Sequence, residues 1–198
     1  TKDEFLYAYE DGIFVLEGMN KNLIGVDIKE ALGLNDLIID FEITSNRPDC
    51  LSVLGLAREI AAVLNTCVKV PNLDFSAGSD TIANYINSIS IENKDICKRY
   101  IGKVIKNIKI APSPYWLRKR LISCGIRPIN NIVDITNYVM LEIGQPLHAF
   151  DYKKLCGKNI SVRLAKSDEQ IITLDGVKRK LRCDDIVIAD EKRAIAIA

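Results

Sequence analysis

The chain has 198 residues, 48% of them hydrophobic, and its 27 Lys and Arg residues nearly balance its 26 Asp and Glu residues. A chain of this size and composition is expected to fold around one core or two small ones. The net charge of +1 argues against a global basic field for nucleic acid, and no apolar run reaches the roughly 18 residues that span a bilayer. We expect a cytoplasmic protein without a signal peptide or a membrane partner.

The N-terminal part of the chain predicts short elements. Residues 12–16 resemble a strand, and Asp27 is the expected cap of a short helix that ends at Gly33. Residues 37–43 alternate between apolar and acidic side chains, which predicts a half-buried strand.

A second helix is expected to begin at a cap, Asp49, and to end near Asn65. Arg47 and Arg58 are candidates for binding phosphate or carboxylate groups, although salt bridges are the more common role of surface arginines. The Pro, Gly, Ser and Asp residues of 70–80 follow no period and predict a linker.

Strands are expected over residues 88–92 and 100–110, followed by a helix capped by Ser113 that ends near Cys124. The helix residues expected to pack inward are Trp116, Leu117, Leu121 and Ile122. Its outer face is basic, with Arg118, Lys119 and Arg120. We interpret this face as a solvated helix surface, with contact to a nucleic-acid backbone as the alternative.

The segment 125–151 combines a helical apolar pattern with many polar groups. Apolar residues spaced three and four apart predict a helix from about Ile132 to Ile143 that ends at Gly144. Its polar side chains have two interpretations. Either they satisfy local backbone groups, as buried polar groups usually do, or Thr136, Asn137 and His148 line a polar pocket.

The C-terminal part predicts strands. The expected strands span residues 160–164, 170–174, 177–181, 185–190 and 193–198. Asp175-Gly176 is a hairpin signal between the second and third. Because the chain stops within an apolar strand, we expect it to be a stretch of a longer chain.

The cysteines predict no zinc site. Six are scattered without a C-x-x-C pair, and His148 is the only histidine, so no metal ligand is assigned. The even number permits disulfides, but without a secretory signal we expect reduced cysteines that mostly fill small spaces in the core.

Together these patterns predict an α+β protein, with a mixed, layered domain of sheet and helices preceded by a smaller segment of helix and strand. The candidate polar pocket contains Arg127, Thr136, Asn137 and His148. The residues alone name no substrate, because phosphate-loop, nucleophile-elbow and dinucleotide motifs are missing.

Several long motifs resemble the beta subunit of bacterial phenylalanine–tRNA ligases. They are Asn46-Arg-Pro-Asp-Cys-Leu-Ser-Val-Leu-Gly55, Gly125-Ile-Arg-Pro128, Asn131-Ile-Val-Asp-Ile-Thr-Asn-Tyr-Val139 and Gly144-Gln-Pro-Leu-His-Ala-Phe-Asp151. The resemblance implies four regions. They are the end of an OB-like tRNA-binding domain (1–38), a small helical domain (39–77), a linker (78–84) and a C-terminally truncated editing domain (85–198).

The resemblance also implies a function. In this family the alpha subunit joins phenylalanine to its tRNA with ATP and magnesium, in a heterotetramer of two alpha and two beta subunits. The editing domain of the beta subunit hydrolyses tyrosine wrongly attached to the phenylalanine tRNA. This chain itself is expected to hold no cofactor.

Carried over by position, the resemblance places six residues in or beside the editing pocket. His148, Asn137 and Thr136 are the expected catalytic residues, and Arg127, Pro146 and Ala198 the expected substrate-binding residues. His148 is expected to act either as a general base or, with Asn137, in orienting the ester or the water.

Three other interpretations remain open. The first is a non-catalytic scaffold for tRNA binding and subunit assembly, using Arg47 and the basic helix face. The second is a free-standing deacylase, and the third is a metal hydrolase, which a single histidine disfavours.

Overall fold

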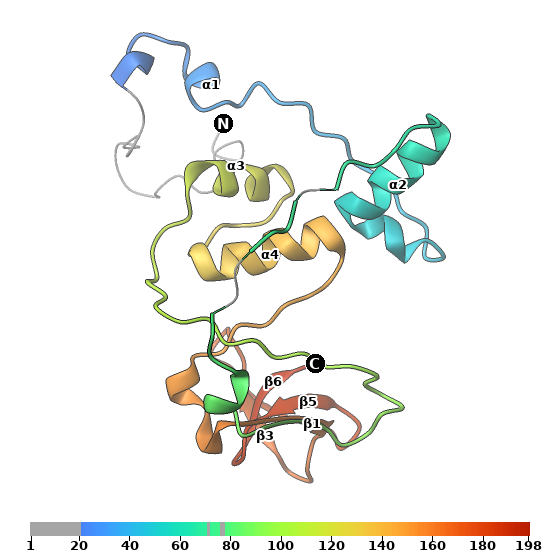
Figure 1. The fold of residues 1–198 in the computed structure, drawn as a ribbon, viewed down its shortest axis with the longest axis vertical. Coiled ribbons are helices and arrows are strands. Elements are labelled where there is room, and N and C mark those ends of the chain that lie inside the picture. The colour runs from blue at the N-terminus through green and yellow to red at the C-terminus, as the bar shows by residue number, and fades with distance from the viewer. Residues whose placement is uncertain (1–20, 71, 76–77) are drawn as a thin grey trace. The chain divides into compact units, whose positions relative to one another are not determined.

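The computed structural model describes residues 21–198 except 71, 76 and 77 (Figure 1). The chain forms two compact units, each built from two separate stretches of sequence. Unit 1 contains residues up to Val68 and the stretch Ile110–Leu147, whereas unit 2 contains Lys69–Lys109 and His148–Ala198. The strand predicted over residues 12–16 lies outside the described residues.

Unit 1 is helical. Its α-helices are α1 (Ile28–Ala31), α2 (Val53–Val63), α3 (Tyr115–Ser123) and α4 (Asn131–Ile143), with short 3₁₀ helices η1 (Lys21–Leu23) and η2 (Pro48–Leu51). Helix α4 packs against both α2 and α3. The short helix α1 begins at Asp27, which accepts a hydrogen bond from the backbone N–H of Lys29 at 2.8 Å, as predicted.

Helix α4 forms where its sequence pattern predicts it. The side chain of Asn130 caps its start by accepting hydrogen bonds from the backbone N–H groups of Ile132 and Val133, each at 3.1 Å. Gly144 ends the helix in the left-handed conformation, with φ of 76°. Its first turn buries Asp134, which is 1% exposed and accepts hydrogen bonds from the Ser113 hydroxyl at 2.5 Å and the Ile129 N–H at 2.7 Å.

Two predicted helix caps are wrong. Ser52, not Asp49, caps α2, accepting a hydrogen bond from the N–H of Gly55 at 3.1 Å. The carboxylate of Asp49 is instead bound by Arg47. Ser113 does not cap α3, because its hydroxyl donates to the buried Asp134 carboxylate.

Two predicted strands are also wrong. Residues 37–43 and 100–110 form neither strand nor helix. Leu37 is 83% exposed and Ile39 is 62% exposed, so the alternating side chains of the first segment face no sheet partner. In α3, only Leu117 and Leu121 are buried, whereas Trp116 is 55% exposed and lies edge-on against Tyr138 of α4. Ile122 is 38% exposed, so its predicted inward packing is wrong too.

Unit 2 contains the sheets. Its strands are β1 (Ser88–Ile91), β2 (Asn159–Leu164), β3 (Gln170–Ile172), β4 (Lys178–Lys180), β5 (Ile186–Ala189) and β6 (Ala194–Ile197). The main sheet has the order β1-β2-β5-β6, in which β1 and β2 are parallel and the other pairs antiparallel. Strands β3 and β4 form the predicted hairpin around Gly176. The mixture of helices and sheets confirms the predicted α+β class.

The remaining short elements of unit 2 are the 3₁₀ helices η3 (Ile82–Asn84), η4 (Tyr152–Lys154) and η5 (Cys156–Lys158). Two apolar clusters stabilise the sheets. One joins the hairpin to the main sheet and contains Ala165, Ile171, Leu181, Val187 and Ala194. The other contains Ile160, Ile188 and Ala196, with Phe150 and Leu155 packed against it.

The six cysteines are free thiols, but only Cys50 is buried, so the expectation that most of them fill the core is wrong. None of the helices in the described residues combines the length and the apolar character that crossing a membrane requires.

Candidate functional site

Two of the predicted site residues, Thr136 and Asn137, lie in α4, and both are partly buried. The hydroxyl of Thr136 donates a hydrogen bond to the backbone carbonyl of Val133 at 2.7 Å. This contact agrees with the first of the two interpretations, in which the polar side chains of this segment satisfy local backbone groups. A hydroxyl that donates one hydrogen bond still has lone pairs with which to accept another from a bound molecule.

Arg127 and Pro146 lie on the segments that lead into and out of α4. Both are exposed. The guanidinium of an arginine stays charged at all physiological pH values and suits carboxylate or phosphate groups. The position of Arg127 at the surface is therefore compatible with a role in binding an anionic or ester-bearing substrate.

His148 begins the second stretch of unit 2. Its ring stacks on that of Phe150, with 4.4 Å between the centroids and 28° between the planes. Partial burial of the ring lowers the pKa of His148 below its ordinary value, because the charged imidazolium loses hydration. At neutral pH the imidazole is therefore neutral, which is the form that can accept a proton.

Ala198 follows β6 and is exposed. Its backbone N–H donates to the carbonyl of Ile186 at 2.9 Å, which continues the pairing of β5 with β6. The predicted site residues thus divide between the units: Arg127, Thr136, Asn137 and Pro146 belong to unit 1, and His148 and Ala198 to unit 2. Their assembly into one pocket stays a prediction.

Unit 2 contains a cleft that the sequence patterns did not predict. It has a volume of about 710 Å³ and lies among β6, the β3–β4 hairpin and the segment around η4. Phe150, Ile171 and Ile195 line it with apolar surface, and Lys154, Lys178 and Arg193 line it with charge. The sequence signal was weak, because these three cations lie far apart in the chain and only Lys178 belongs to a basic run of three, Lys178–Lys180.

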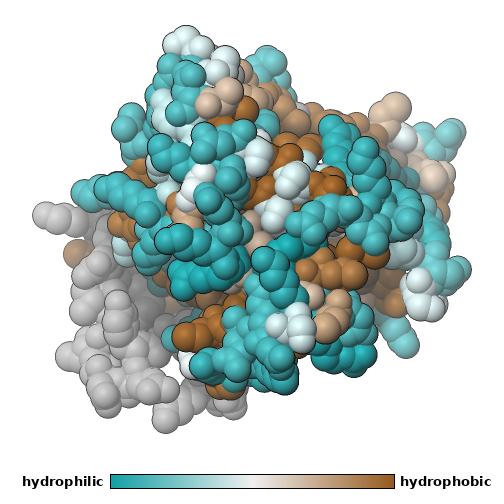
Figure 2. Space-filling model, turned by 90° about the horizontal axis from the view of Figure 1, so that it is seen from below, coloured by the Kyte–Doolittle hydropathy of each residue, from teal (hydrophilic) through white to brown (hydrophobic). Residues whose placement is uncertain are grey.

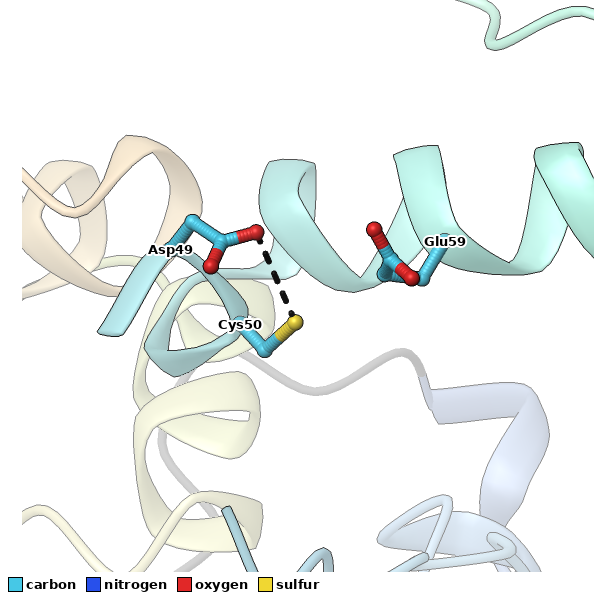
Figure 3. Close-up of side chains that lie close together, drawn as sticks. All are labelled: Asp49, Cys50 and Glu59. Atoms are coloured by element: carbon cyan, nitrogen blue, oxygen red, sulfur yellow. Dashed lines mark hydrogen bonds between the residues drawn. The ribbon is translucent and has the colours of Figure 1, made fainter. Parts of the chain in front are cut away.

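A cluster in unit 1 brings together three potential metal ligands, Asp49, Cys50 and Glu59 (Figure 3). Arg47 already binds both carboxylates. Its Nε and Nη2 atoms donate to Asp49 at 3.1 and 2.9 Å, and its Nη2 atom lies 2.5 Å from Glu59. Salt bridges were the expected role of Arg47, and its contacts with Asp49 and Glu59 confirm this role. These contacts link the turn at η2 to helix α2.

The Cys50 thiol of this cluster is unsuited to binding metal. Burial is the largest influence on it and raises its pKa, which favours the protonated thiol over the thiolate that binds metals. The adjacent Arg47 lowers the pKa of Asp49, because its guanidinium stabilises the ionised carboxylate. The cluster therefore fits an internal ion pair better than a cation site.

The basic face of α3 is partly engaged within unit 1. Arg120 donates to the Tyr138 hydroxyl at 2.8 Å and lies over the ring of Trp116. Lys119 lies 3.4 Å from the Asp36 carboxylate. These contacts favour a structural role for this face over a nucleic-acid contact.

Residues 96–198 match the model of a protein family described as the B3/4 domain. The chain belongs to the B3/4 domain family. This match covers β2 to β6, helices α3 and α4 and all six predicted site residues.

The chain is also similar to curated beta subunits of phenylalanine–tRNA ligase. It is 54% identical to that of Fusobacterium nucleatum over 88% of this chain and 22% of the relative. It is 49% identical to that of Clostridium acetobutylicum over 100% of this chain and 25% of the relative. With the Bacillus subtilis subunit it shares 47% identity over 96% of this chain and 23% of the relative. The resemblance drawn from the motifs is confirmed, and the chain spans about a quarter of the length of these relatives.

Proposed function

We propose that this chain is the part of a phenylalanine–tRNA ligase beta subunit that hydrolyses tyrosine wrongly attached to the phenylalanine tRNA. The observation that carries the proposal is the identity of 49% over the whole chain to a curated beta subunit, together with the B3/4 domain match. The domain limits 1–38, 39–77, 78–84 and 85–198 remain part of this proposal.

The need for such a reaction follows from the chemistry of the amino acids. Tyrosine differs from phenylalanine by one hydroxyl, and an apolar pocket rejects a substrate with an added hydroxyl by only about 10²-fold. A second pocket that hydrogen-bonds the phenol can select tyrosine. Phenylalanine would leave the polar lining of that pocket without a partner, at a cost of roughly 1–3 kcal/mol.

The proposed reaction is the hydrolysis of an ester. Water attacks the carbonyl carbon of the tyrosyl ester, the bond to the ribose oxygen breaks, and tyrosine and the tRNA are released. The neutral imidazole of His148 would accept the proton of the water and return it to the leaving oxygen. The lowered pKa of His148 supports this role, because the ring is unprotonated at neutral pH.

Asn137 and Thr136 are proposed to orient the ester or the water. The Thr136 hydroxyl donates to Val133, so toward a substrate it is available as an acceptor. Arg127, Pro146 and Ala198 are proposed to form the walls of the pocket. If Asn137 and Thr136 hold the water tightly, His148 can serve in positioning alone, without proton transfer.

Cofactors and partners belong to the larger enzyme. We propose a cytoplasmic ligase with an alpha subunit in a heterotetramer, which uses ATP and Mg²⁺. Among the described residues, the cluster of potential metal ligands at Asp49, Cys50 and Glu59 does not fit Mg²⁺. Mg²⁺ prefers oxygen ligands, whereas in the cluster of potential ligands Cys50 offers a thiol and Arg47 binds both carboxylates. No step of the proposed hydrolysis uses ATP or Mg²⁺.

The test is the hydrolysis of Tyr-tRNA and Phe-tRNA, both made with the phenylalanine tRNA. It compares this chain, a version extended beyond Ala198, and the extended version with His148→Ala or Asn137→Ala. The expected result is selective hydrolysis of Tyr-tRNA that slows about 10²-fold or more in the His148 variant. Gln145→Ala, an exposed change three residues from His148, is the matched control. An extended protein that hydrolyses neither substrate would contradict the proposal.

A second candidate is a scaffold for subunit assembly without catalysis. Apolar side chains exposed on and beside α2 favour it, since such groups are often covered by a partner. They are Leu51, Val53, Ile60, Val63 and Leu64. Tight tRNA binding with a steep salt dependence and no deacylation would support this alternative.

A further inference from the structure

The cleft of unit 2 has an apolar floor and a cationic rim. Phe150 and Ile195 of the floor pack against the cluster around Ile160 and Ile188, so the floor is anchored in the core of the main sheet. Ile171 and Ala194 belong to the cluster that joins the β3–β4 hairpin to the main sheet. The floor is therefore a fixed surface rather than a set of mobile side chains.

The rim carries three cations from three different elements. Lys154 belongs to η4, Lys178 to β4, and Arg193 directly precedes β6. Among the described residues, none of the three forms a salt bridge, although other exposed lysines such as Lys106 and Lys180 do. Asp151 is the one acidic residue in the lining, so the cleft holds an excess of positive charge.

The Asp151 carboxylate offsets only one of the three cations Lys154, Lys178 and Arg193. It also accepts a hydrogen bond from the backbone N–H of Lys153 at 3.0 Å as the cap of η4. Cations held together in a cleft without enough counter-charge attract anions and raise their local concentration. The volume of about 710 Å³ lies in the range of about 300–1,000 Å³ typical of ligand sites.

We propose that this cleft binds the single-stranded end of an RNA, with phosphates on Lys154, Lys178 and Arg193 and a base against the apolar floor. This inference rests on the proposed function, because it assigns further residues to the tRNA substrate. It adds Lys154, Lys178 and Arg193 as positioning residues to the six predicted site residues.

The combination of surfaces favours RNA over an acidic peptide. Single-stranded nucleic acids bind to grooves that combine cations along the backbone with aromatic rings that stack on bases. Here the cationic rim adjoins Phe150, whose ring is already stacked with that of His148. Figure 2 shows hydrophobic residues scattered among hydrophilic ones on the face that it draws.

The experiment measures the affinity of the full-length protein, with any subunit that copurifies, for uncharged phenylalanine tRNA over a range of salt concentrations. The variants are Lys154→Ala, Lys178→Ala, Arg193→Ala and their combination. Each lost phosphate contact on a single strand is expected to reduce the salt slope by about 0.7, and the triple variant by about 2. For Tyr-tRNA hydrolysis the variants should raise KM with little change in kcat.

Lys94→Ala is the matched control, since Lys94 is an exposed lysine of unit 2 outside the cleft. The exchanges Lys154→Arg and Arg193→Lys, which keep the charge, should restore the salt slope. Wild-type slopes in the triple variant would overturn the cleft proposal. If the triple variant keeps the wild-type salt slope but His148→Ala loses hydrolysis, the cleft proposal fails while the proposed function is still supported.

Two further outcomes are informative. If a poly-glutamate peptide binds as tightly as the RNA and in competition with it, the cleft is a general anion site and the proposal is overturned. If the triple variant loses affinity for tRNA but not for a duplex RNA without a single-stranded end, the proposal is supported.

Discussion

Arg163 and Glu169 form a buried ion pair in unit 2, with Nη1–Oε2 and Nη2–Oε1 distances of 2.8 and 2.7 Å. Their side chains are only 6% and 12% exposed. The Glu169 carboxylate also accepts hydrogen bonds from the N–H groups of Lys166 and Ala194. It thereby joins β2, the loop before β3, and the start of β6.

Glu169→Gln should destabilise the protein strongly. The substitution leaves the Arg163 charge buried without its partner, and breaking such a pair typically costs about 3–5 kcal/mol. Denaturant unfolding of the variant and the wild type measures the difference. Asp168→Asn is the control, because Asp168 pairs with Lys180 at the surface and such pairs contribute about 0–1 kcal/mol. Equal losses in the two variants would contradict the prediction.

The same pair predicts a window of acid sensitivity. The hydrogen bond from Arg163 is the main cause that lowers the pKa of Glu169 from 4.5 to about 2. Because the folded pKa lies below the unfolded value, the stabilisation is fully present above about pH 4.5 and is lost as the pH falls toward 2. Unfolding free energies measured between pH 6 and pH 2.5 should fall more steeply for the wild type than for Glu169→Gln.

Gly55→Ala should destabilise α2, although alanine is normally favoured over glycine in a helix by about 1 kcal/mol. A Cβ atom at Gly55 would lie 1.8 Å from the backbone carbonyl oxygen of Asp49, which cannot move as a side chain does. Gly78→Ala is the control, since a Cβ there meets nothing within 4 Å. A lower Tm for the first variant and an unchanged or slightly higher Tm for the second are expected.

Asn130→Ala should remove the N-cap of α4 and cost about 1 kcal/mol. The two hydrogen bonds from Ile132 and Val133 disappear, while the helix residues themselves are unchanged. Asn130→Asp keeps a capping oxygen and should retain most of the stability. Chemical denaturation distinguishes the two, and equal losses would show that the cap is not the cause.

If His148 is the general base, the hydrolysis rate should rise with pH through the pKa of this residue and level off above it. Burial lowers this pKa below 6.5, so the midpoint of the acidic limb should lie below that value. The measurement is the rate of Tyr-tRNA hydrolysis between pH 5 and pH 8. The variant His148→Gln should lack the limb, and its persistence there would assign it to another group.

Local signals predicted helix α4 well, because two of them agree. The apolar spacing and Gly144, which adopts the left-handed conformation, both mark the helix, and the structure adds Asn130 as its N-cap. The same holds for the β3–β4 hairpin, whose turn residue Gly176 adopts a positive φ. Elements with consistent local signals therefore need little help from the rest of the fold.

The failures have tertiary causes. Residues 37–43 have the alternation of a strand, but a strand also requires a partner, which no local pattern can supply. Ser113 is a suitable cap by type, yet its hydroxyl donates a hydrogen bond to the buried carboxylate of Asp134, 21 residues later. The cleft of unit 2 was missed because its cations come from separate elements that only the sheet order brings together.

The parallel pairing of β1 with β2 joins residues about 70 positions apart, such as Ser88 and Asn159. The stretch Ile110–Leu147, which lies between them in the sequence, belongs to unit 1. During synthesis on the ribosome, β1 therefore emerges well before its partner and must wait until the intervening helices have been made. Contacts of such long sequence separation slow folding, so the maturation of this sheet is expected to depend on the pace of translation and on protection of β1 by chaperones.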